Sequence, residues 1–269
     1  VVTPAIGGWI GEQFSLRTVY LISTFWFVPS TLAIMRTRPY PTPEPPPGGH
    51  DYRGLLRRRA VTGPLVVFTL GFVAILTGQT LSSQYLEEAR GFSRGAIGMF
   101  GSLSALGTAV FSLLLGRLSS WRGFFSSLLL VLIAFALLVS TGHTLVVAAA
   151  AFLLGAHYAA RPLAASVIGA RVPAHQHGVA YALVDTMAGL ATLIGTNAAG
   201  RLFAANPNWP FAVGMVGLAL VTALGVALRL RTDDTATMSA LDARAAELAS
   251  ALEAANLKLT GLVVERQYD

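Results

Sequence analysis

Three acidic or basic side chains stand well inside long apolar runs of this sequence, away from the ends of the runs. Asp185 lies in the run 178–203, and His157 and Arg161 lie in the run 144–170. A charge deep in a bilayer is costly, so it usually faces a cavity or a partner and marks a functional pathway. In helical geometry Arg161 is about 15 Å, and Asp185 about 10 Å, from the near end of its run. Because the two runs are consecutive and antiparallel, an ion pair between Arg161 and Asp185 is geometrically feasible.

The chemistry expected of this pair is proton-linked opening. Asp185 is the titratable member, because an arginine does not lose its proton in a protein. We therefore predict an intramembrane pair whose opening is coupled to protonation or to a substrate. Two other interpretations remain open, namely a static pair that joins two helices and an Arg161 side chain that extends toward the cytoplasm.

Other polar side chains in the apolar runs are candidates for the same site. His157 precedes Arg161 by four residues and shares its helical face, and an imidazole suits a proton relay. A hydrogen-bonded structural histidine is the alternative. Gln79 and Gln84 lie in an earlier run, where Gln79 is placed to hydrogen-bond a substrate or to join two helices. Phe72 and Phe100 fit either an apolar pocket or a lipid-facing surface.

The composition favours a lipid-embedded protein. Of the 269 residues, 54% are hydrophobic and 12% are charged, and the mean hydropathy is +0.62. Soluble proteins carry roughly 25% charged residues, so this chain has too little charge to cover a water-exposed surface. Cysteine is absent, which excludes disulfides and thiolate metal sites. The net charge of +6 comes largely from arginines between the apolar runs, which favours membrane orientation over nucleic-acid binding.

The apolar runs predict seven complete membrane spans after a helical stub. About 20 apolar residues cross a bilayer core of about 30 Å. The stub is residues 1–10, closed by Gly11, and a basic turn is expected over 116–122. The spans are predicted over 17–35, 64–86, 93–115, 124–140, 144–170, 178–203 and 209–228. Pro162 is expected to bend its span.

Two segments are predicted outside the membrane. Residues 38–60 are rich in proline and arginine, and proline favours an extended linker over a helix. A binding site for a proline-recognising partner is the alternative to a simple tether. Leucine and alanine at heptad spacing predict a helix in the tail, 232–269, which is either solvated or used for self-association or partner docking. The transmembrane parts are then 1–37 and 61–231.

The arginines agree with one orientation throughout the predicted spans. Positively charged residues concentrate in cytoplasmic loops. With the proline-rich linker in the cytoplasm, the C-terminus is also cytoplasmic. The inside arginines are 36, 38, 53, 57, 58, 59, 117, 122, 171, 229 and 231, against the outside arginines 17, 90, 94 and 201.

Three short motifs add a family resemblance over residues 1–231. The stretch from Thr3 to Gly8, with Pro4, Gly7 and Gly8, resembles the end of the fifth-helix GPxxGG antiporter motif. The loop with Gly116, Arg117, Arg122 and Gly123 resembles the GxLxDRxGRR loop between the eighth and ninth helices, without its Asp. The loop 172–178 resembles the VPxxxRG-type loop before the eleventh helix. With the layout of spans, the chain resembles the major facilitator superfamily, and its drug/proton antiporter branch in particular.

The resemblance implies an all-α polytopic membrane fold built of two repeated six-helix halves. The chain would hold the end of helix 5, helix 6 and a complete C-terminal half, so roughly four and a half helices would be missing and this chain alone should not transport. The fifth and eleventh helices are equivalents, which explains why Thr196–Gly200, with Asn197 and Gly200, echoes Thr3–Gly8. Small residues there permit close helix packing.

The function expected from the resemblance is secondary transport by alternating access. We expect proton-coupled efflux of small lipophilic or drug-like compounds, with a small-molecule substrate, protons and the lipid bilayer as partners, in the plasma (inner) membrane. The alternatives are an importer of a small metabolite and a transport-inactive scaffold or sensor that uses its tail. No catalytic motif is recognisable, so we expect neither an enzyme nor a cofactor or metal site. His175 and His177 lack further ligands.

Overall fold

Every regular element that the structure describes is helical. The computed structural model describes residues 3–37 and 52–228. The chain divides into two units, Val1–Thr222 and Ala223–Asp269, and only residues 223–228 of the second are described, as the end of a helix. The predicted tail helix and most of the predicted linker lie outside the described residues, so their structure stays a prediction.

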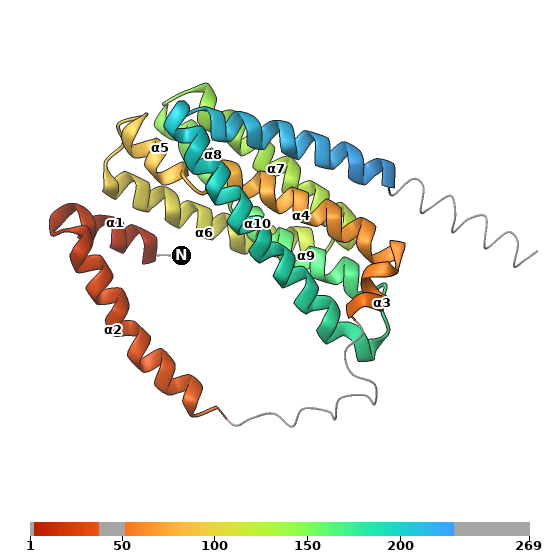
Figure 1. Cartoon of the computed structure of the whole chain (residues 1–269). Helices are drawn as coiled ribbons and strands as arrows, with labels where there is room; N and C mark the ends of the chain where they lie inside the picture. Colours follow the sequence, from red (N-terminus) through yellow and green to blue (C-terminus); the bar gives the residue numbers. More distant parts are fainter. Residues whose placement is uncertain (1–2, 38–51, 229–269) are drawn as a thin grey trace, which may run out of the picture. The chain divides into compact units, whose positions relative to one another are not determined.

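Figure 1 shows the described helices in chain order. In chain order they are α1 (Thr3–Gln13), α2 (Leu16–Met35), α3 (Tyr52–Arg57), α4 (Arg59–Gln79), α5 (Ser82–Glu88), α6 (Arg94–Gly116), α7 (Ser120–Ser140), α8 (Thr144–Leu154), α9 (His157–Gly169), a 3-10 turn (Ala174–Gln176) and α10 (His177–Ala205), followed by the helix Trp209–Leu228. Within the described ranges, 7 helical stretches are long and apolar enough to cross a membrane. They are the seven spans that the sequence predicts.

Two helix boundaries differ from the prediction. The first helix does not close at Gly11, which is buried inside α1, but continues to Gln13. The basic turn is also shorter than predicted, because α7 already begins at Ser120 and therefore includes Arg122. The ring of Trp121 packs against Phe68 and Phe125, with centroid distances of 5.4 Å to each. Phe125 belongs to α7 itself, so it is the contact with Phe68 that holds the first turn of α7 against α4.

Two of the spans are interrupted, which the sequence analysis did not predict at these places. The span Arg59–Glu88 is broken between α4 and α5, so the predicted continuous helix 64–86 is wrong. The span Thr144–Gly169 is broken at Gly155 between α8 and α9. Pro162 lies inside α9, which continues past it. Gly155 lies very close to α6, since a side chain there would overlap the backbone of Ser104 and Thr108.

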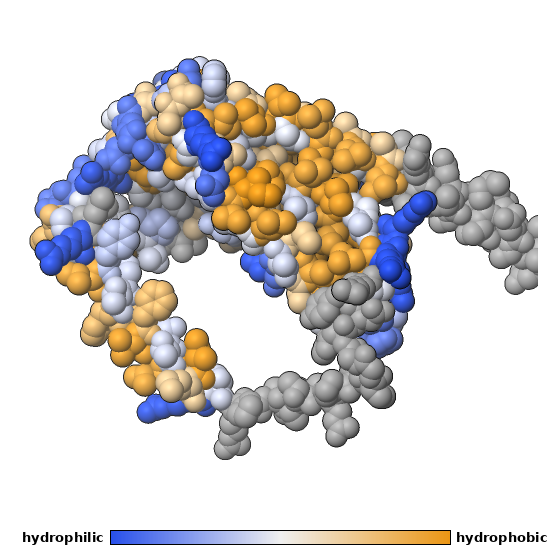
Figure 2. Space-filling view, in the orientation of Figure 1, coloured by the Kyte–Doolittle hydropathy of each residue, from blue (hydrophilic) through white to orange (hydrophobic). Residues whose placement is uncertain are grey.

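Aromatic residues form the buried centre of the bundle. The ring of Phe124 on α7 lies 4.5 Å from that of Phe68 on α4, and Phe135 lies 5.6 Å from Phe211. Each of these side chains is buried. Figure 2 shows apolar side chains over the middle of the visible face of the bundle and polar side chains toward its ends. This distribution is the one expected of a protein whose middle contacts hydrocarbon.

Small residues set the distances between helices. α1 packs on α6, and α4 packs on α10. A Cβ on Gly8 would lie 2.8 Å from the Cα of Gly98 on α6, and a Cβ on Gly195 of α10 would lie 2.9 Å from the Cβ of Leu76. Backbones that approach this closely leave no room for a side chain, and close packing of this kind replaces the missing hydrophobic drive between helices in lipid.

The contact of α6 with α8 gives a test of this packing. A Cβ on Gly107 would overlap the carbonyl oxygen of Phe152, whereas a Cβ on Gly116 of the same helix would meet open space. We expect Gly107→Ala to lower the free energy of unfolding by about 1–3 kcal/mol through overpacking. Gly116→Ala should be neutral or stabilising, because alanine is the better helix former. Unfolding in detergent micelles measures both, and equal stability of the two variants would contradict the packing.

Candidate functional site

Arg161 on α9 and Asp185 on α10 form an ion pair. Arg161 Nη2 lies 2.7 Å from Asp185 Oδ1, and Arg161 Nε donates a hydrogen bond to the same oxygen at 2.9 Å. Each side chain is 58% exposed. The structure thus brings together the two residues that the sequence analysis pairs, while their role in coupling stays a prediction. Neither side chain is buried within the described part of the chain.

Arg161 also lines a cavity of about 400 Å³, here called the charged cavity. Its lining comes from α4, α9 and α10 and combines one cation with apolar and weakly polar side chains. The residues are Phe72, Ile75, Leu76, His157, Tyr158, Arg161, Pro162, Ala188 and Thr192. Phe72 is therefore a cavity residue and does not face lipid. A cation that lines a cavity is the arrangement expected of an intramembrane charge with a function.

His157 joins the two helix interruptions. It is the first residue of α9, and Gln79 is the last residue of α4. His157 Nε2 lies 3.0 Å from Gln79 Nε2, and His157 Nδ1 lies 2.6 Å from the carbonyl oxygen of Leu154. Gln79 therefore lies at the end of α4, although it falls well inside the predicted span 64–86.

These contacts assign the proton on the imidazole. A carbonyl oxygen only accepts, so Nδ1 of His157 donates to Leu154 and carries the proton. In the neutral ring Nε2 is then an acceptor, and it takes a hydrogen bond from the amide nitrogen of Gln79. Gln79 Oε1 is left buried without a partner among the described residues. A doubly protonated His157 would instead need an acceptor, which Gln79 supplies only if its amide turns to present Oε1.

A second cavity, here called the hydroxyl cavity, lies on the other side of this contact. Its volume is about 490 Å³. Gln79 lines this cavity, His157 lines the charged cavity, and Tyr158 lines both. The remaining lining residues are Pro4, Ser82, Ser83, Leu86, Ile97, Phe100, Gly101, Ser104, Ala105, Thr108, Leu138, Ala151 and Leu154. The Gln79–His157 hydrogen bond therefore bridges residues of the two cavities.

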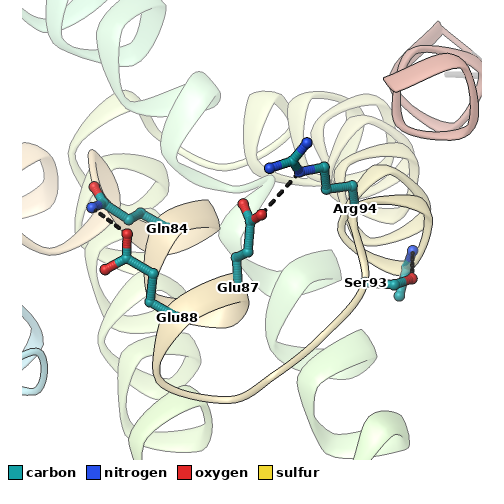
Figure 3. A network of polar contacts seen from close by, with 6 residues as sticks. Gln84, Glu87, Glu88, Ser93 and Arg94 are labelled. Atoms are coloured by element: carbon teal, nitrogen blue, oxygen red, sulfur yellow. Dashed lines mark hydrogen bonds and ion pairs between the residues drawn. The ribbon is translucent and has the colours of Figure 1, made fainter. Parts of the chain in front are cut away.

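Gln84 does not belong to this site. It lies on the short helix α5, and its side-chain amide donates to Glu88 Oε1 at 2.8 Å on the exposed surface (Figure 3). Nearby, Arg94 Nε and Glu87 Oε1 form an ion pair at 2.9 Å. Gln84 thus lies in the short helix α5, after the interruption that follows Gln79, and not in one helix with Gln79 as the predicted helix 64–86 would have it.

Of the two predicted packing motifs, Thr3–Gly8 contacts another described helix, whereas in Thr196–Gly200 only Ala199 is buried. In the first motif, Thr3–Gly8, two residues pack directly on α6: Gly8 contacts Gly98, and the ring of Pro4 contacts Gly101. The backbone N–H of Ala5 also donates a hydrogen bond to Ser102 Oγ at 3.0 Å. A Cβ on Gly7 would lie 4.0 Å from Val19. At the second, Asn197 is exposed and donates to the carbonyl of Leu193 on its own helix, and a Cβ on Gly200 would meet nothing described within 4 Å.

The packing of α10 on α4 uses the opposite face of that helix. Ala191 and Ala199 are fully buried, and Gly195 between them meets Leu76. These three residues repeat every four positions and so form one helical stripe. The expectation that Asn197 and Gly200 make the helix contact is therefore not met within the described part of the chain.

The predicted gating loop contains two exposed arginines and one closely packed glycine. Arg117 and Arg122 are exposed, Gly116 borders open space, and a Cβ on Gly123 would lie 2.8 Å from the carbonyl of Leu115. Trp121 of this loop forms a cation–π contact with Arg171, which lies outside the loop. The Arg171 guanidinium lies 5.4 Å from its ring centre and donates to the carbonyl of Val167 at 2.6 Å. Partial burial lowers the pKa of Arg171, which nevertheless stays charged.

Comparison with known proteins identifies the family. The family model described as Major Facilitator Superfamily matches residues 1–123 and, separately, residues 65–264. The chain belongs to the major facilitator superfamily. The two matches overlap over 65–123, as a family of two repeated halves permits. No curated protein gives a significant match to the sequence.

Family membership establishes several coarse properties. The fold is that of an all-helical, multi-pass membrane protein, and the members are transporters of small molecules that are generally not enzymes. Within the described residues, no three His, Cys, Asp or Glu side chains are grouped so that they could hold a metal ion.

Sequence analysis missed the hydroxyl residues of the second cavity. Ser82, Ser83, Ser104 and Thr108 are single polar residues in apolar surroundings and carry no motif. A weak signal was available, because Phe100, Ser104 and Thr108 recur every four residues and so share one face of α6. That face becomes meaningful only when its neighbours α5, α8 and α9 are known.

The Gln79–His157 contact can be tested by a double-mutant cycle. His157→Phe leaves the Gln79 amide without its acceptor, and Gln79→Met leaves His157 without its donor. Each should lower the free energy of unfolding by about 1–3 kcal/mol, because a buried polar group loses its partner. The double variant should lose less than the sum, with a coupling of about 1 kcal/mol or more.

The matched control for this cycle is Gln84→Met, since Gln84 is an exposed glutamine with its own side-chain partner. It should change the unfolding free energy by less than about 0.5 kcal/mol. Unfolding in detergent micelles is the measurement for all four variants. Strict additivity of His157→Phe and Gln79→Met would show that the two side chains do not interact.

Proposed function

We propose that this chain forms part of a proton-coupled exporter in which the Arg161–Asp185 pair couples protons to transport. The observation that carries this proposal is an ion pair between two membrane spans, at 2.7 Å, whose arginine lines a cavity. Protonation of Asp185 would remove the negative partner and free Arg161. Since the pair joins α9 to α10, its opening would loosen one helix against the other, which is the kind of step that alternating access requires.

The cargo proposed is a small lipophilic or drug-like compound. Support comes from the two cavities, whose linings are largely apolar and include a single permanently charged side chain, Arg161. Their volumes of about 490 and 400 Å³ fall in the range of small-molecule sites. The resemblance of the Pro4–Gly8 stretch to the antiporter motif favours export over import. The drug/proton antiporter branch and the direction of transport are both part of this proposal.

The proposed location is the plasma (inner) membrane with the arginine-rich ends in the cytoplasm. The loop between α6 and α7 and the start of α4 would then be cytoplasmic, while the loop between α5 and α6 would be outside. Support comes from the excess of arginine on one side of the predicted spans. The proposed domain bounds, 1–37, 38–60, 61–231 and 232–269, follow from the same topology.

The orientation can be tested by thiol labelling, because the chain has no cysteine of its own. Glu88→Cys places a single thiol in the α5–α6 region, and Ser119→Cys places one before α7. A membrane-impermeant thiol reagent added to intact cells should label Glu88→Cys alone. Ser119→Cys should be labelled only after permeabilisation. The reverse pattern would overturn the orientation.

The coupling role can be tested by Asp185→Asn in the complete gene product. The amide keeps the shape of Asp185 but cannot titrate, so efflux of the neutral dye Nile red should no longer respond to an imposed pH gradient in proteoliposomes. Folding should be retained, because the amide oxygen of the substituted side chain can still accept a hydrogen bond from Arg161.

Glu87→Gln is the matched control for this experiment, since it breaks the exposed Arg94–Glu87 pair by the same chemical change. It should leave pH-driven flux unchanged. If Asp185→Asn transports with the same dependence on the pH gradient as the unaltered protein, the proposed coupling role is wrong.

A further inference from the structure

The hydroxyl cavity is lined without a single charged side chain. Its residues are apolar, hydroxyl-bearing or amide-bearing, and they come from helices α4 to α9 together with Pro4 of α1. The charged cavity, in contrast, contains Arg161. The volume of about 490 Å³ is large enough for a small organic molecule. The two cavities therefore offer different chemistry within one bundle.

Three hydroxyl groups in this cavity are uncommitted. The side chains of Ser82, Ser83 and Ser104 form no hydrogen bond with any described residue. Thr108 differs, because its hydroxyl donates to the carbonyl oxygens of Ser104 and Gly155 at 3.0 and 3.2 Å. A serine hydroxyl both donates and accepts. The cavity thus presents free donors and acceptors from two helices, α5 and α6.

The rest of the lining is a hydrophobic wall. Phe100 is 6% exposed and packs edge-on against Phe92 at 5.2 Å, so its ring is held in place. Leu86 and Leu138 are likewise buried beside the cavity. A pocket with a rigid apolar wall and a few convergent polar groups is the usual form of a small-molecule site.

We propose that the hydroxyl cavity binds the transported compound, and that this compound is an uncharged amphipathic molecule with hydroxyl or carbonyl groups along one edge. The polar edge would bond to Ser82, Ser83 and Ser104, and the apolar face would pack on Phe100. An ion would lose its hydration here without gaining a countercharge. This inference rests on the proposed function, and it assigns cargo to one cavity and charge coupling to the other.

Side-chain contacts connect the hydroxyl cavity with the charged cavity. Tyr158 lines both cavities, and the Gln79–His157 hydrogen bond joins a residue of each lining. His157 precedes Arg161 by one helical turn on α9. A change at the Arg161–Asp185 pair can therefore reach the cargo cavity through a single turn of helix and one hydrogen bond.

Ligand protection of a single thiol tests the site directly. In the complete gene product, Ser104→Cys should react with a methanethiosulfonate reagent, and saturating chloramphenicol should slow that reaction about fivefold or more by covering the thiol. Chloramphenicol is an uncharged aromatic compound with two hydroxyl groups and an amide, and podophyllotoxin is a second neutral probe. Ethidium, an aromatic cation, should give no protection.

The control is Ser112→Cys, on the same helix but exposed and outside the cavity lining. Its reaction should not change with any of the three compounds. Ser104→Val should weaken chloramphenicol binding about tenfold, the equivalent of one lost hydrogen bond, and Ser112→Val should not. Protection of Ser104→Cys by neither neutral probe, or equal protection by ethidium, would overturn the inference.

The outcomes separate this inference from the proposed function. Binding needs no titratable group, so Asp185→Asn should keep chloramphenicol protection of the Ser104→Cys thiol. Protection together with pH-independent flux of the unaltered protein would refute the coupling proposal and leave the cargo site standing. Coupled flux of Nile red without protection by either neutral probe would refute the cargo site alone.

Discussion

The structure depends on the rule that a backbone polar group in hydrocarbon must find a partner inside the protein. An interrupted helix breaks this rule locally, because carbonyl groups at the break lose their usual donors. At the break between α8 and α9, the imidazole of His157 donates to Leu154 and the hydroxyl of Thr108 donates to Gly155. These side chains are therefore held in place by the backbone that they satisfy, and the two cavities form around them.

Close helix packing lowers the free-energy cost of the break between α8 and α9. Gly155 and Gly107 let α6 approach the interrupted span so closely that no Cβ would fit. The same approach brings the Thr108 hydroxyl within reach of the Gly155 carbonyl, which a longer interhelical distance would prevent. In lipid, helices gain little from burying apolar side chains against each other, so contacts of this kind carry the association. At Gly155, therefore, the close approach of α6 and the hydrogen bond to the Gly155 carbonyl depend on each other.

The spans could be predicted because each needs about 20 apolar residues, and length and hydropathy are local properties of sequence. The Arg161–Asp185 pair could also be anticipated, since charges in apolar runs are few and their depth follows from helical rise. The interruption after Gln79 was not predicted, because no proline marks it and the polar residues between Gln79 and Gln84 are also compatible with a continuous helix. Nor was the contact of Gln79 with His157, which joins residues far apart in the chain and arises only from the packing of α4 and α9.

The protonation state of His157 decides what that contact can transmit. The neutral ring accepts from the Gln79 amide, while its other nitrogen remains bonded to Leu154. A second proton would set donor against donor, so either the contact opens or the amide turns and buries its NH₂ group in place of an oxygen that has no described partner. Arg161 on α9, Asp185 on α10 and the adjoining Tyr158 are the charged and titratable side chains around His157 in the described site. Only the neutral ring fits the two hydrogen bonds as the structure has them, so the link between the two cavity linings depends on an imidazole that carries a single proton.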